Sequence, residues 1–173
     1  DLEFNTVLTF VSNLCVTESG KELAMEIVPY KTKEQTLHAL QQTSEYLASF
    51  TNNNVIPNHY FEGIDYELKF LGIEDSFLEV SSFKKIYNLT ETTSNLITYF
   101  KKFSDYYPYL SSDTATLTLE KSILKEIEHV LDKYGEIKDN ASVDLLSIRK
   151  SINLVRGKIN QSFGYALSQY NSA

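Results

Sequence analysis

The chain has 173 residues, 42% of them hydrophobic and 23% charged, which is enough apolar material for one sizeable core. Its 16 Lys and Arg face 23 Asp and Glu, and the net charge of -7 excludes a surface that wraps nucleic acid on all sides. The single cysteine, Cys15, excludes an internal disulfide and a cysteine zinc cluster. We expect a cytoplasmic chain without a membrane span.

The first predicted helix lies near the start of the chain. Apolar residues recur there every three or four positions, which is typical of a helix with one apolar face. They are Phe4, Val7, Leu8, Val11 and Leu14.

Two short helices joined by a proline bend are predicted next. Thr17 can cap the first of them through its side-chain oxygen, and Pro29 stops it. Thr32 and Gln35 have the spacing of a capping box, which predicts the start of the second helix. That helix ends before the three asparagines of residues 52–54.

The middle of the chain combines an irregular stretch with a long helix. Pro57, Gly63 and Gly72 interrupt the apolar pattern, so no element is predicted with them. From Phe83 to Phe100 the spacing of three and four returns and predicts a long helix.

Another helix is predicted from Leu119 to Val130, with Gly135 as a left-handed cap that ends it. Extended structure is indicated only by the alternating threonines around Leu117 and by residues 135–138.

The last segment differs in kind, because Ser142 can cap a long helix in which apolar residues recur almost as heptads. Its four cations have no acidic residue among them from Leu145 to Ala173. They are either a solvated flank or a surface that approaches nucleic acid: Arg149, Lys150, Arg156 and Lys158. We expect the apolar positions to form one half of an antiparallel coiled coil, and these are Leu145, Ile148, Ile152, Val155, Ile159, Phe163, Ala166 and Tyr170.

Gly20-Lys21 raises the question of a phosphate-binding loop. Such a loop needs a glycine five residues before Gly20 and a Ser or Thr after the lysine. Cys15 and Glu22 occupy those positions, and a carboxylate beside the lysine would repel phosphate. The sequence therefore predicts no nucleotide site here.

Few other residues suggest chemistry. Glu126 and His129 match half of a di-iron motif, but the second half is missing, so a surface pair is favoured. Phe77 and Glu79 have the spacing of the Phe-x-Glu wedge that probes mismatched base pairs, although the domain carrying that wedge is not evident. We predict no catalytic residue and no metal or cofactor site.

A tyrosine cluster, Tyr106, Tyr107 and Tyr109, is either a partner patch, a platform for stacking bases, or the packing of a helix junction. Tyrosine suits all three, and the helix junction is favoured.

Two stretches carry a family resemblance. Leu2-Glu3-Phe4 with Val7-Leu8, followed by Thr17-x-x-Gly20-Lys21-x-Leu23 and then Pro29, resembles the opening of the MutS core domain, above all in the MutS-two paralogues. Gly135-Glu136-Ile137-Lys138-Asp139-x-Ala141-Ser142, with Arg149 beyond it, resembles the turn that leads into the lever helix of that family.

The resemblance implies a parent protein that is a dimeric ATPase with core, lever and clamp regions, using ATP and magnesium, and often carrying an Smr nuclease domain. It implies branched or duplex DNA, or collided ribosomes, as partners. No catalytic role transfers to this chain, and the matched positions are structural: Thr17, Gly20, Pro29, Gly135, Asp139, Ser142 and Arg149.

The expected fold is therefore all-α, with a helical core over residues 1–141 and the start of a lever helix over 142–173. The expected function is a non-catalytic segment that couples the ATPase of the parent to a nucleic-acid clamp. A free-standing helical adaptor is the main alternative, with the tyrosines and the apolar seam as its binding surfaces, and a small helical enzyme with an unrecognised site also stays open.

Overall fold

The computed structural model describes residues 3–171 and contains only helices and one isolated bridge as regular structure in that range. The all-α prediction is thus confirmed, including the long last helix. Leu2 of the opening motif and the last two residues of the range 142–173 lie outside the described residues. The chain divides into two units, residues 1–124 and residues 125–173.

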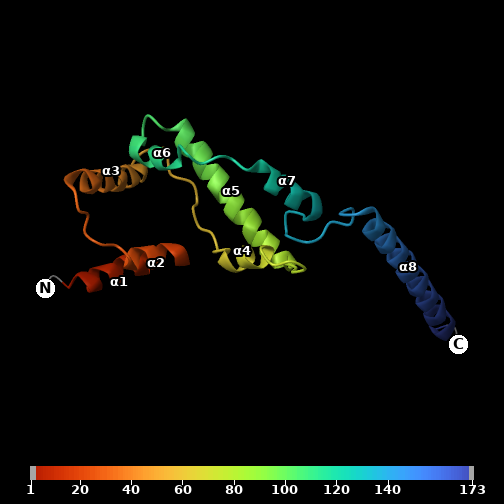
Figure 1. Ribbon diagram of the computed structural model, residues 1–173. Helices are drawn as coiled ribbons and strands as arrows, with labels where there is room; N and C mark the ends of the chain where they lie inside the picture. Colours follow the sequence, from red (N-terminus) through yellow and green to blue (C-terminus); the bar gives the residue numbers. More distant parts are fainter. Residues whose placement is uncertain (1–2, 172–173) are drawn as a thin grey trace. The chain divides into compact units, whose positions relative to one another are not determined.

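Eight helices make up the described chain, in the order shown in Figure 1. They are α1 (Phe4–Leu14), α2 (Glu18–Met25), α3 (Lys33–Ser49), α4 (Asp65–Leu71), α5 (Val80–Lys102), α6 (Pro108–Thr114), α7 (Lys121–Val130) and α8 (Val143–Asn171).

Helix α1 packs against α2 as a pair at the start of the first unit. Leu8 and Ala24 are the buried residues of the two helices, as the apolar spacing requires. Helix α2 ends at Met25, so the prediction that it continues to Pro29 was wrong in its last turn. The reason is steric. Pro29 disfavours helical geometry at the residue before it, Val28, and the β-branched side chains of Ile27 and Val28 lower the preference for helix further.

Helix α3 begins as its capping box predicts. The Thr32 hydroxyl accepts a hydrogen bond from the Gln35 backbone N–H at 3.2 Å, and the Gln35 side chain accepts one from the Lys31 N–H at 3.3 Å. In the usual capping box the glutamine side chain accepts a hydrogen bond from the N–H of the cap residue itself. Here it accepts one from the residue before the cap, Lys31.

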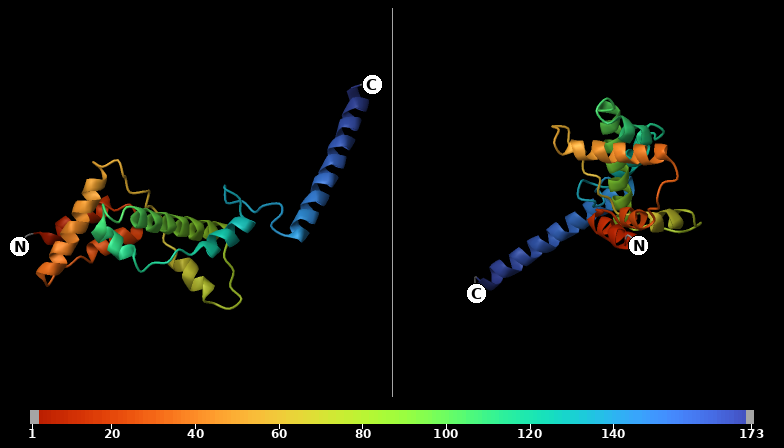
Figure 2. Two further views of the ribbon diagram at one scale, coloured as in Figure 1. Left: turned by 90° about the horizontal axis from the view of Figure 1, so that it is seen from above. Right: turned by 90° about the vertical axis from the view of Figure 1, so that its left-hand side faces the viewer.

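Helix α6 contacts both α3 and α5, which joins these helices at one end of α5 (Figure 2). The first turn of α6 has no cap from its own neighbourhood, because Tyr107 provides none. Instead both oxygens of the Glu45 carboxylate, on α3, accept hydrogen bonds from the backbone N–H groups of Tyr109 and Leu110, each at 2.9 Å. Gln42 and Asp113 add a hydrogen bond of 2.5 Å between the same two helices.

A tyrosine pair fixes the long connection between α3 and α4. The hydroxyls of Tyr99 and Tyr107 both donate to the backbone carbonyl of Asn54, at 2.6 and 2.9 Å. Their rings stack with centroids 5.9 Å apart, and Tyr107 is fully buried. The helix-junction interpretation of the tyrosine cluster therefore holds for Tyr107.

The second unit contains a turn that Gly135 makes possible. Its φ of 79° is left-handed, as predicted, but α7 already ends at Val130, so Gly135 does not cap the helix. It lies in a tight turn closed by an antiparallel bridge between Leu131 and Ile137. The threonines around Leu117 form no strand, because extended structure needs a partner to complete its hydrogen bonds.

Candidate functional site

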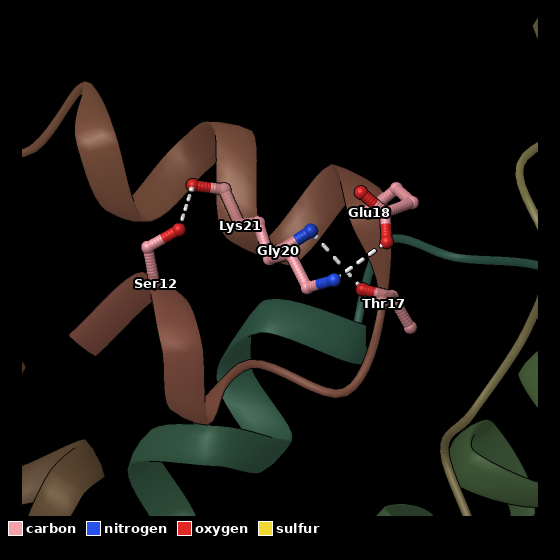
Figure 3. Close-up of polar contacts among 5 residues, drawn as sticks. All are labelled: Ser12, Thr17, Glu18, Gly20 and Lys21. Carbon is pink, nitrogen blue, oxygen red and sulfur yellow. Dashed lines mark hydrogen bonds and ion pairs between the residues drawn. The ribbon is translucent and has the colours of Figure 1, made fainter. Parts of the chain in front are cut away.

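Two matched positions of the first unit, Thr17 and Gly20, lie at the junction of α1 and α2, shown in Figure 3. The Thr17 hydroxyl accepts a hydrogen bond from the Gly20 N–H at 3.0 Å, which confirms the predicted cap. A Cβ on residue 20 would lie 2.9 Å from that hydroxyl, so a larger residue there would have to displace the capping side chain. Thr17 and Gly20 thus act together to start α2.

Lys21 and Ser12 complete this junction. The Lys21 ammonium lies 2.6 Å from the Glu18 carboxylate, and the hydrogen bond between them raises the pKa of Lys21 (Figure 3). The Ser12 hydroxyl donates to the Lys21 carbonyl at 3.2 Å and ties α1 to α2. The lysine is therefore engaged within its own helix, which is a structural role. Pro29 lies in the irregular segment between α2 and α3 and is not part of this junction.

The matched positions of the second unit gather around the turn before α8. The Asp132 carboxylate accepts hydrogen bonds from the backbone N–H groups of Tyr134 and Glu136, at 2.8 and 3.0 Å. The bond from Glu136 is the largest cause of the lowered pKa of Asp132. Lys138 donates its backbone N–H to the Val130 carbonyl at 2.9 Å, and its ammonium reaches the Glu128 carbonyl. The turn is thus held by charged side chains and by its own backbone.

Arg149 fastens α8 to that turn. Its Nη1 donates to the Ile137 carbonyl at 3.1 Å and forms an ion pair with the Asp139 carboxylate. The Ser142 hydroxyl accepts from the Leu145 N–H at 3.1 Å, which confirms it as the cap of α8. Three matched positions, Asp139, Ser142 and Arg149, therefore set the direction in which α8 leaves the turn. We call this group the exit lock.

The remaining cations of α8 differ from Arg149. Lys150, Arg156 and Lys158 are exposed, and within residues 3–171 none of the three forms a salt bridge. At about 100° per residue, Arg156 lies on one flank of the apolar seam and Lys158 on the other. Lys150 lies on the face of the helix opposite the seam. The cations therefore border the seam and do not make one continuous basic stripe.

The apolar seam of α8 is uncovered in this chain. Ile152 is 45% exposed and Ile159 is 50% exposed, and every described side chain from Lys150 to Tyr170 is classed with them as exposed. A helix that shows aliphatic residues at near-heptad spacing has the form of one strand of a coiled coil.

The other candidates give no site. Over residues 3–171 no group of His, Cys, Asp and Glu is arranged to hold a metal ion, and Glu126 with His129 remains a pair on α7. In the same range no helix combines the length and the hydropathy needed to cross a bilayer. Sequence reasoning missed Glu67, a buried carboxylate on α4, because its helix is short and lies in the irregular stretch.

Comparison with known proteins finds relatives that match most of this chain. The chain is similar to MutS2 proteins. It is 27% identical over 171 residues to the endonuclease MutS2 of Halothermothrix orenii, which covers 92% of this chain and 21% of that protein. Two Staphylococcus aureus proteins of the same name, from strains MRSA252 and Newman, are 24% identical over 168 residues, covering 93% of this chain and 21% of theirs.

The chain thus spans about a fifth of the length of the curated relatives it matches. No family model matches it, and no solved structure matches it. The relatives are named endonucleases, and that activity belongs to proteins about five times longer than the matched segment.

Proposed function

We propose that this chain is the core segment and outgoing lever of a MutS2-like protein, and that it is not itself catalytic. In this proposal the lever is α8, and the chain transmits motion from an ATPase elsewhere in the parent to a nucleic-acid clamp. ATP, magnesium and any nuclease chemistry belong to other parts of the parent. The partner in this proposal is branched or duplex DNA, or the ribosome. The parent is a cytoplasmic homodimer. The boundary between core and lever lies near residues 141 and 142.

The exit lock is the observation that supports this proposal most directly. A segment that transmits motion has to be stiff where it changes direction, since a loose joint would absorb the displacement. Arg149 binds a backbone carbonyl and a carboxylate of the turn from the second turn of α8, while Ser142 caps the first. These residues coincide with the positions that resemble the entrance to the family's lever.

The matched test uses two arginines of the same helix in the complete parent protein. Arg149→Gln removes the exit lock, and Arg156→Gln removes the same charge from an unpaired position. We expect Arg149→Gln to leave basal ATP hydrolysis and DNA affinity within about twofold, but to lose most of the stimulation of ATP hydrolysis by branched DNA or ribosomes. Arg156→Gln should retain that stimulation and weaken DNA binding with a reduced salt dependence, by about 0.9 in the log–log slope.

Two results would contradict the proposal. If Arg149→Gln and Arg156→Gln behave alike, the exit lock has no special part in coupling. If the gene encodes no Walker-type GK[ST] sequence in the same frame as this chain, there is no ATPase to couple.

A free-standing adaptor remains the second candidate because of the uncovered seam of α8. Its aliphatic residues would then receive a helix from another protein. The tyrosine cluster was the other binding surface expected of an adaptor, but its middle residue, Tyr107, is buried and cannot contact a partner.

A further inference from the structure

We draw no further inference here: the strongest candidate, the uncovered apolar seam of α8 with Arg156 and Lys158 on its two flanks, carries nothing beyond the lever already proposed, because nothing in the structure shows what covers it.

Discussion

Glu45 provides the sharpest test of how the first unit is held together. Its carboxylate replaces the missing cap of α6, a helix that lies more than sixty residues further along the chain. We predict that Glu45→Ala destabilises the first unit, because two backbone N–H groups at the start of α6 lose their acceptor.

The expected magnitude follows from the geometry. An N-cap is worth about 0.5–2 kcal/mol, and hydrogen bonds to a charged group about 1.5–3 kcal/mol when they are sheltered. Glu45 is half-buried and both of its bonds measure 2.9 Å, so we expect a loss of about 1–2 kcal/mol. Glu45→Gln keeps one acceptor oxygen and should cost about half as much.

Urea unfolding, followed by helical circular dichroism and by tyrosine fluorescence, measures this loss. Glu22→Ala is the matched control, because it removes an exposed carboxylate that makes no hydrogen bond in the described chain. The reasoning fails if Glu45→Ala and Glu22→Ala change the free energy of unfolding equally, or if Glu45→Gln costs as much as the alanine.

Four further outcomes are expected. Gly135→Ala should cost about 1 kcal/mol in the second unit, measured by thermal unfolding, because alanine is strained at a φ of 79°; an unchanged midpoint would show that the turn relaxes. Tyr107→Phe should cost about 0.5–1.5 kcal/mol, since Asn54 keeps only one of its two donors, and a stabilised variant would refute this. Ile152→Lys should weaken self-association in sedimentation experiments, because the uncovered seam is where a second helix would pack, and an unaltered dimer would count against that use of α8. Calorimetry should detect no saturable ATP binding, and binding that Lys21→Ala removes would reverse our reading of Gly20-Lys21.

The helix starts were predictable because a cap is local in sequence. Thr17, Thr32 and Ser142 each bond to a backbone N–H three residues later, so the residue types and their spacing contain the information. The helix α4 was missed because it is short and because Ile64, the residue before its first turn, offers no side-chain cap. The end of α2 was placed too late because Pro29 disfavours helical geometry at Val28, and the β-branched Ile27 and Val28 favour the helix only weakly.

Long-range contacts could not be read from periodicity. Nothing near Glu45 indicates that it caps α6, because the two meet only after α3 and α6 are packed. The resemblance marked Arg149 as a matched position but did not name its partners, Ile137 and Asp139. The burial of Glu67 likewise depends on tertiary packing, which a single sequence does not show.

The double donation to Asn54 makes the first unit sensitive to base. Burial is the main cause that raises the pKa of Tyr99 above its ordinary 10.0, and the neighbouring hydroxyl of Tyr107 adds to this. A group whose pKa is higher in the folded chain contributes stability that is complete below its unfolded pKa and is lost as the pH rises through the folded value. When the Tyr99 phenol ionises at high pH, Asn54 loses one of its two donors and a negative charge is placed beside its carbonyl. Alkali should therefore release the connection between α3 and α4 before it melts the helices, with the tyrosinate absorbance of Tyr99 appearing together with that release.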